Sequence, residues 1–162
     1  MTGRLKAIAI RPARKAPMQA LQAVSVSASH GLEGDHAGKS PDRMVTVMSA
    51  EAWQDALDAL DPPLEAGEHL DWTVRRANLL TEGAALPRAK GGIIRIGELV
   101  LEVTGQTWPC KRMEEARPGL LKALAQDWRG GVTCSVREAG PVASGDAVEI
   151  LVSPPEVKRR LP

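Results

Sequence analysis

Closely spaced turn residues divide this chain into short segments, and this spacing limits the possible fold more than any other feature of the sequence. In GGIIRIGELVLEV, residues 91–103, apolar residues alternate with polar ones on both sides of Gly97-Glu98, a pattern typical of a β-hairpin. Similar segments are Leu5–Ile10, Leu21–Ser27, Arg43–Met48, Trp72–Leu80, Gly131–Arg137 and Ala147–Val152. Strands separated by Gly and Pro turns favour a closed or sandwiched sheet over a parallel βαβ array.

Two segments have helical features. Ser49 has the residue type of an N-cap, and Glu51 in the first turn suits the helix dipole. Apolar residues then recur at helical spacing, at Trp53, Ala56, Leu57 and Leu60. Pro118 is a candidate first residue of a second short helix that carries three leucines. The sequence therefore predicts a mostly β domain with two short helices.

Composition excludes several classes of protein. The chain has four Trp but no Tyr or Phe, which argues against the aromatic platforms that bind single-stranded nucleic acid, and its formal net charge is only +1. No apolar run approaches the roughly 20 residues of a membrane span, and the N-terminus lacks the apolar core of a signal peptide. We expect a cytoplasmic protein, with no nucleic-acid or membrane partner, whose two cysteines are thiols.

The two cysteines have different surroundings. Cys134 lies at period two with Val132 and Val136, which predicts a small buried hydrophobic residue inside a strand. Cys110 lies in TGQTWPCKRM, where the preceding proline makes a continued strand unfavourable and places the thiol on a loop. The adjacent Lys111 and Arg112 favour the thiolate, which is the form that attacks electrophiles and binds metals. An inert loop thiol remains the alternative.

The segment HGLEGDH, residues 30–36, is a second candidate site. Its two glycines predict a tight turn, and Asp35 stands beside His36, whose imidazole titrates near neutral pH. Three interpretations are open: His36 assists a nearby thiol, Asp35 only hydrogen-bonds its own loop, or His30, His36 and Asp35 form part of a metal site.

A third candidate is VRRANLL. Read as a strand, it places Arg76 and Asn78 side by side on one face, with Arg75 on the other. A guanidinium and an amide in that arrangement can hold a phosphate or a planar heterocycle, although an exposed arginine pair would look the same. Arg43, Lys111 and Arg112 would add to this positive site if the fold brings them together.

Taken in order, these motifs resemble one known family. GLEGDH, R-x-V-T-V-M-S, R-x-N, the GGIIRIGELVLEVTG hairpin ending in PC, GGV-x-C-x-V and GD-x-V are similar to the MOSC domain family, named for the C-terminal domain of molybdenum-cofactor sulfurase. The similarity runs from about residue 5 to residue 152, which implies a single MOSC domain over 1–162 in the stand-alone bacterial form. The fold it implies is a MOSC-type β-barrel with a few short peripheral helices.

The resemblance also implies chemistry. The family's functional cysteine falls on Cys110, and the family either carries sulfur on it as a persulfide or uses it to ligate the molybdenum of a pterin cofactor. In amidoxime-reducing members the R-x-N residues contact the cofactor, which corresponds here to Arg76 and Asn78. The loop before the cysteine lines the site, which corresponds to Trp108 and Pro109. Electrons or sulfur would come from a separate electron-donor protein or a pyridoxal-phosphate-dependent cysteine desulfurase.

Two uses of the thiolate follow, and the sequence does not choose between them. It can accept sulfane sulfur from a desulfurase, or it can be a soft molybdenum ligand beside Arg43, Arg76 and Asn78 in an enzyme that reduces N-hydroxylated compounds. Two functions of other classes are open as well. Cys110, His36 and Asp35 can form a thiol hydrolase, and the arginines can form a binding module for a small anion.

Overall fold

The computed structural model describes residues 2–36, 38, 40 and 44–156. Within this part of the chain the strands are β1 (Thr2–Ile10), β2 (Gln19–Leu21), β3 (Ala23–Ser27), β4 (Gly31–Leu32), β5 (Val45–Ser49), β6 (Leu79–Glu82), β7 (Ile93–Ile96), β8 (Leu99–Gln106), β9 (Val132–Glu138), β10 (Gly140–Ala143) and β11 (Ala147–Val152). The helices are α1 (Ala50–Asp58), the short 3-10 helix η1 (Trp72–Arg75), α2 (Lys111–Ala116) and α3 (Leu120–Leu124).

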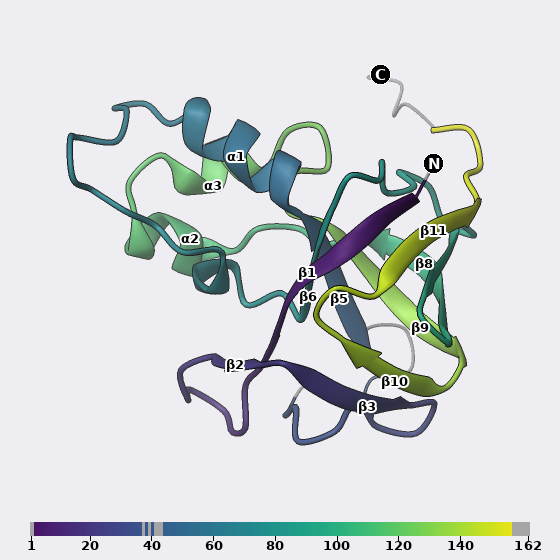
Figure 1. The fold of residues 1–162 in the computed structure, drawn as a ribbon. Coiled ribbons are helices and arrows are strands. Elements are labelled where there is room, and N and C mark those ends of the chain that lie inside the picture. The colour runs from purple at the N-terminus through teal and green to yellow at the C-terminus, as the bar shows by residue number, and fades with distance from the viewer. Residues whose placement is uncertain (1, 37, 39, 41–43, 157–162) are drawn as a thin grey trace.

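Seven strands form a closed barrel in the order β11-β7-β8-β9-β5-β6-β1, and pairing of β1 with β11 completes the ring (Figure 1). All neighbouring pairs are antiparallel except β5 and β6. β2 adds to β1 at the outside, and β10, β3 and β4 form a small second sheet. The predicted mostly β barrel is therefore confirmed, and closure removes the exposed strand edges that an open sheet would leave.

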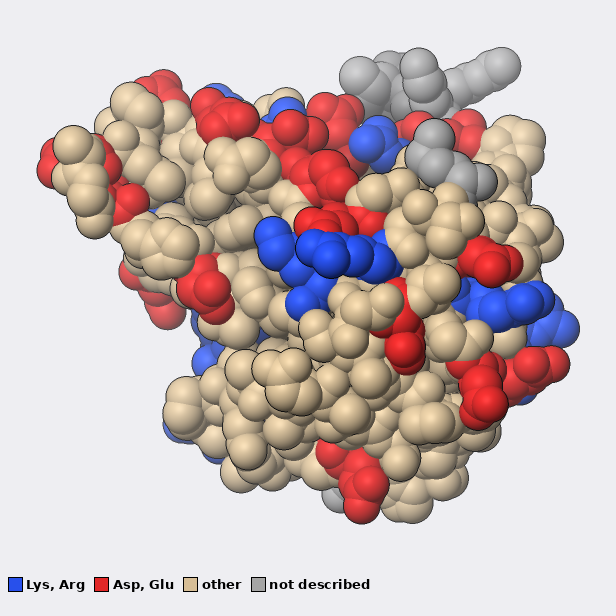
Figure 2. Space-filling model, viewed as in Figure 1, with Lys and Arg blue, Asp and Glu red and all other residues tan. Residues whose placement is uncertain are grey.

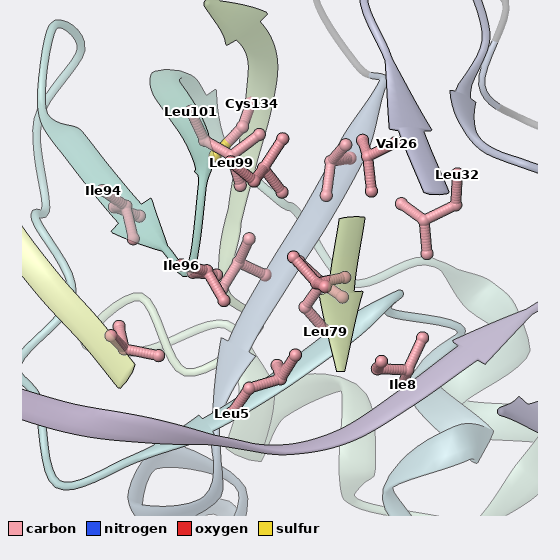
Figure 3. Close-up of a cluster of buried hydrophobic side chains, with 14 of the residues drawn as sticks. Leu5, Ile8, Val26, Leu32, Leu79, Ile94, Ile96, Leu99, Leu101 and Cys134 are labelled. Carbon is pink, nitrogen blue, oxygen red and sulfur yellow. The ribbon is translucent and has the colours of Figure 1, made fainter. Parts of the chain in front are cut away.

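The barrel interior is filled by the apolar residues that the alternation assigned to one face. In the β7–β8 hairpin, Ile94, Ile96, Leu99, Leu101 and Val103 are all fully buried. Figure 3 shows several of these side chains pointing toward one another across the barrel, together with Cys134 from β9. The predicted hairpin and the predicted burial of Cys134 are both confirmed.

A second apolar cluster lies outside the barrel, where the helices cover β5 and β6 (Figure 1). Ser49 caps α1 as predicted, because its hydroxyl accepts a hydrogen bond from the backbone N–H of Ala52 at 3.0 Å. Trp53 and Ala56 of α1 are buried against Met48 of β5 and the leucines of α3. In the described residues this layer lies on one side of the barrel, and α2, which follows Cys110, joins it through Met113.

The predicted strand over Trp72–Leu80 is wrong in its first half. Asp71 caps η1 by accepting a hydrogen bond from the backbone N–H of Thr73, and Arg76 then adopts a left-handed conformation with φ of 63°. Extended pairing begins only at Leu79. The alternation of Val74, Arg76 and Asn78 fits a strand by period alone, but the capped turn reverses the chain before the ladder starts.

The prediction of two short helices is also incomplete. The helix near Pro118 begins at Leu120, after Gly119 in a left-handed conformation. The structure adds α2 directly after Cys110, where one buried side chain, Met113, fastens a helix of six residues to the outer cluster. A helix this short shows no apolar period in the sequence, so its position depends on packing.

Candidate functional site

Cys110 lies on a short loop between a barrel strand and a helix. β8 ends at Gln106, and the backbone N–H of Thr107 then donates to the carbonyl of Gly131 at 2.9 Å. The chain leaves the barrel over Trp108 and Pro109, and Cys110 is the residue before α2. Its free thiol is exposed, whereas the free thiol of Cys134 is buried, and burial raises the pKa of Cys134.

The side chain of Arg75 holds this loop by a hydrogen bond. Its side chain comes from η1 and is only 7% exposed, and Nη2 donates to the carbonyl of Thr107 at 3.2 Å. Gly130 provides the space for this contact, since a Cβ there would lie 2.5 Å from the Thr107 oxygen and 3.3 Å from Nη2 of Arg75. The guanidinium is thus held between the Cys110 loop and the chain just before β9.

The charges around the thiol are mostly positive. Burial lowers the pKa of Arg75, and attraction to Cys110 acts in the opposite direction. The pKa of Arg76 is lowered by burial and then by repulsion from Arg112 and Arg11, while attraction to Cys110 again raises it. Four arginines therefore interact electrostatically with one another or with Cys110, and they come from the residue after β1, from η1 and the residue after it, and from α2.

The same place holds most of the unsatisfied buried polar atoms. Four buried side-chain nitrogen or oxygen atoms have no hydrogen-bond partner in the described part of the chain, and three of them are Nε of Arg75, Nη1 of Arg76 and Oγ1 of Thr107. Buried polar groups are nearly always paired in native proteins, so a cluster of exceptions needs an explanation. Two orphan guanidinium nitrogens beside a thiol can donate to a bound anion.

A cavity of about 340 Å³ is lined on one side by Arg76, whereas Arg75, Thr107 and Cys110 do not line it. Arg76 and Arg112 contribute the charge, and Met18, Val74 and Met113 contribute an apolar wall. The cavity lies between the β1–β2 loop, η1 and α2, and its lining contains no Asp or Glu from the part of the chain that the structure describes. It therefore offers space for an anionic group with an apolar body.

Asn78 is already engaged in the fold. Its Oδ1 accepts hydrogen bonds from the backbone N–H and the hydroxyl of Thr46, at 3.0 and 3.1 Å, and its Nδ2 donates to the carbonyl of Ala9 at 3.2 Å. The buried amide joins β5 to β1 next to Arg76. Its contact with a cofactor remains a prediction, and the structure gives it a positioning role.

The GLEGDH turn is tied to the same end of the barrel. Oδ1 of Asp35 accepts a hydrogen bond from the backbone N–H of Arg11 at 2.9 Å, and the backbone N–H of His36 donates to the Arg11 carbonyl at 2.8 Å. The side chain of His36 is exposed. No hydrogen bond connects Asp35 or His36 with Cys110 within residues 2–36 and 44–156, and the hydrogen bonds of these two residues hold the backbone of Arg11.

The other predicted residues are placed as follows. Trp108 is 62% exposed, and Lys111 and Arg112 are exposed at the start of α2. Arg43 lies outside the described residues. His30 bonds Ser29 through Nδ1 at 2.8 Å, and the described residues contain no group of three or more His, Cys, Asp or Glu side chains suited to a metal ion.

The sequence interpretation missed Arg75, because a strand would have turned it away from Arg76 and Asn78. The useful signals were Asp71-x-Thr73, which caps a helical turn, and Gly130-Gly131, which allows close approach of the backbone. Together they place Arg75 under the cysteine loop.

The fold and the site together define a class of domain, a closed seven-stranded barrel with an exposed thiol on a loop beside buried and half-buried arginines. The MOSC domain model matches residues 33–149, which is most of the chain, and the chain belongs to this family. The match includes Cys110, Arg75 and Arg76.

Solved structures agree with the fold. The YUAD protein from Bacillus subtilis superposes with a TM-score of 0.74 at 17% identity, over 93% of this chain and 96% of that one. YiiM from Geobacillus stearothermophilus gives 0.68 at 15% identity, over 93% and 75% of the two chains, and YiiM from Escherichia coli gives 0.66 at 19%, over 92% and 70%. A comparison with curated proteins finds no match. None of the helices in the described residues is long and apolar enough to cross a membrane.

Proposed function

We propose that this MOSC domain binds a molybdenum pterin cofactor through Cys110 and reduces N-hydroxylated compounds. The observation that supports this most is a pair of buried guanidinium nitrogens, Arg75 Nε and Arg76 Nη1, which have no hydrogen-bond partner among the described residues and whose side chains are attracted to the thiol of Cys110. Unpaired buried donors are costly, and they are tolerated where a ligand completes them.

The donor set fits such a cofactor. A cysteine sulfur is a soft ligand suited to a metal rich in sulfur ligands, and arginines are the preferred partners of phosphate oxygens. Arg75, Arg76, Arg11 and Arg112 supply more positive charge than a single sulfur anion needs, which favours a group with several negative oxygens. When bound, the metal would supply the two-electron reduction of an N–O bond.

The chain's own residues have separate tasks in this proposal. Arg75 holds the Thr107 carbonyl and thereby positions the loop that presents Cys110. Arg76 and Arg112 line the neighbouring cavity and bind anionic oxygens, while Asn78 fixes the strand ends below them. Asp35 acts indirectly, by fastening Arg11 to the GLEGDH turn.

A second function, transport of sulfane sulfur, is favoured by the exposure of Cys110. A thiolate at the surface can attack the outer sulfur of a persulfide on a cysteine desulfurase. The new S–S bond forms on Cys110, the S–S bond of the donor breaks, and the donor cysteine leaves as a thiolate. The hydrolase function has less support, because no hydrogen bond in the described residues connects a base to Cys110.

Native mass spectrometry of protein purified without reductant, from a bacterial host that makes molybdenum cofactor, tests the proposal. Cys110→Ala is the test variant and Cys134→Ala the matched control. An added mass equal to a molybdenum pterin, absent only from Cys110→Ala, supports the cofactor function and leads to reductase assays. One extra sulfur atom with the same dependence supports the sulfur carrier. A bare chain in all three proteins contradicts both and favours the anion-binding module.

A further inference from the structure

We infer that a cavity at one end of the barrel binds an organic cation, namely an ammonium or guanidinium group joined to an apolar body. The cavity measures about 420 Å³ and lies where β5 and β6 end and β9 begins, between the start of α1, the 83–88 loop and the turn before β9. Cavities of about 300–1,000 Å³ are typical of small-molecule sites. Cys110, Arg75 and Arg76 do not line it, so the inference concerns a second site and does not rest on the proposed function.

Part of the cavity lining is apolar. The half-buried ring of Trp128 packs against the barrel core, and the other apolar lining residues are Ala84, Ala85, Leu86, Pro87 and Val132. Asp127 and Trp128 are consecutive residues in the left-handed conformation, with φ of 53° and 56°. This conformation is uncommon for residues other than glycine and costs free energy. Here it places a carboxylate and an aromatic ring on the same cavity, and both groups can attract a cation.

The polar part of the lining is mainly acidic. Among the described residues it contains three carboxylates, those of Glu51, Asp55 and Asp127, and one cation, Arg88. Glu51 and Asp55 lie about one turn apart on α1, a spacing at which like charges destabilise a helix. Figure 2 shows acidic side chains over α1. A cation bound in the cavity would relieve their repulsion.

The three carboxylates differ in the partners that they already have. Glu51 accepts a hydrogen bond from the backbone N–H of Gly83 at 3.0 Å. Asp127 forms an ion pair with Arg129 at 3.7 Å, but its side chain is 65% exposed. The carboxylate of Asp55 has no hydrogen bond or ion pair with another described residue. The negative charge available to a ligand is therefore chiefly that of Asp55 and Asp127.

The start of α1 does not reverse this preference. A helix N-terminus favours anions, but the Ser49 hydroxyl already accepts a hydrogen bond from the backbone N–H of Ala52, and Glu51 supplies negative charge in the first turn. Thr81 is paired with Ser49 between β5 and β6, is fully buried, and has a side-chain oxygen without a partner among the described residues. Because Ser49 lines the cavity, an occupant with hydrogen-bond donors can satisfy this oxygen directly or through water.

Isothermal titration calorimetry with phenethylamine, a primary ammonium with an apolar body, tests the site. Phenethyl alcohol has the same size without the charge, and phenylacetate has the opposite charge. Asp55→Asn/Asp127→Asn removes the available negative charge, and asparagine tolerates the left-handed conformation at 127. Ala52→Leu fills the cavity from α1 without changing its charge, because leucine is also a good helix former. Asp58→Asn/Glu65→Gln is the matched control, since both residues are exposed and neither lines the cavity.

We expect the wild type to bind phenethylamine more tightly than the alcohol or phenylacetate, and less tightly as the ionic strength rises. The Asp55→Asn/Asp127→Asn protein should show a Kd for the amine that is higher by about tenfold or more, with the Kd for the alcohol unchanged, because only ionic contacts are lost. Ala52→Leu should abolish binding of both compounds, whereas the matched control should bind like the wild type.

Three results would overturn the inference. They are the absence of saturable amine binding, an affinity for phenylacetate or the alcohol equal to that for the amine, and equal losses in the matched control and in Asp55→Asn/Asp127→Asn.

Discussion

Two buried arginines, Arg117 and Arg75, differ in what surrounds them. They are 8% and 7% exposed. The guanidinium of Arg117 donates to the Glu68 carboxylate and to the carbonyls of Pro62, Pro63 and Pro118, so every nitrogen has a partner. The guanidinium of Arg75 donates to Thr107 alone, and its Nε has none among the described residues.

We interpret this difference as one between an arginine that stabilises the fold and an arginine that binds a ligand in the proposed function. Arg117 fastens the loop after α1 to the α2–α3 segment, and its contacts account for its burial completely. Arg75 keeps donor capacity unused next to Cys110, which costs stability unless a ligand uses it. We therefore predict a large loss of stability when Arg117 is replaced by an uncharged side chain of similar length, and a small change in stability when Arg75 is replaced in the same way.

Arg117→Met should give the largest loss of stability of the variants considered, because it leaves a carboxylate and three carbonyls without their donor. Denaturant unfolding measures it. A midpoint equal to that of the wild type would remove the distinction between the two arginines.

Gly130→Ala should be next, with a loss of about 1–3 kcal/mol and with impaired loading of the Cys110 site. The added methyl would approach the Thr107 carbonyl to 2.5 Å and press on Arg75. Gly105→Ala in β8 is the control, since its nearest contact would be Oγ1 of Thr133 at 3.8 Å. Equal losses of stability in Gly130→Ala and Gly105→Ala would show that the space between Gly130, Thr107 and Arg75 is not especially tight.

The two cysteines should respond differently. Cys134→Ala should lower the free energy of unfolding by about 1 kcal/mol, through lost packing in the barrel. It should leave the proposed reductase activity unchanged. Cys110→Ala should change stability by less than about 0.5 kcal/mol and abolish activity. Iodoacetamide labelling of the folded protein checks this independently, with one modified thiol expected, at Cys110. Equal labelling of both thiols would be inconsistent with the fold.

The smallest effect concerns pH. The hydrogen bond from Arg117 lowers the pKa of Glu68 below its ordinary value of 4.5. A depressed folded pKa contributes stability that is fully present above the unfolded pKa and is lost as the pH falls through the folded value. The stability difference between wild type and Arg117→Met should therefore narrow below about pH 4.5. A difference that stays constant down to lower pH would mean that the carboxylate contributes little.

The sequence predicted the barrel well because its signals are local. Alternation around Gly97-Glu98 sets the hairpin, Ser49 caps α1, and Val132 and Cys134 share a buried face. Each of these features depends on residues that are neighbours in the sequence, so each can be recognised from a single sequence.

The site was predicted only in part, because it depends on contacts between distant segments. The sequence identified Cys110 and Arg76, whereas Arg75 became visible only when the turn at Asp71 and the packing of Gly130 against Thr107 were known. The sequence also identified Asn78, but in the structure its amide hydrogen-bonds to β5 and to β1. The sequence does not show that these two strands lie on either side of Asn78. No residue next to Arg75 in the sequence indicates its burial, and the signals at Asp71 and Gly130 gain this meaning only when the fold brings them together.

The central claim is that the buried guanidinium of Arg75 binds an anion beside Cys110. The unfolding midpoint of cofactor-free wild type, Arg75→Met and Arg117→Met, measured with increasing inorganic phosphate, tests it most directly. Without phosphate, Arg75→Met should lie within about 1 kcal/mol of the wild type, since it loses one hydrogen bond and an incompletely paired buried charge. With phosphate, the midpoints of the wild type and Arg117→Met should rise more than that of Arg75→Met, because only proteins that retain the site gain binding free energy. Parallel rises in all three, or an Arg75→Met protein as destabilised as Arg117→Met without phosphate, would contradict the claim.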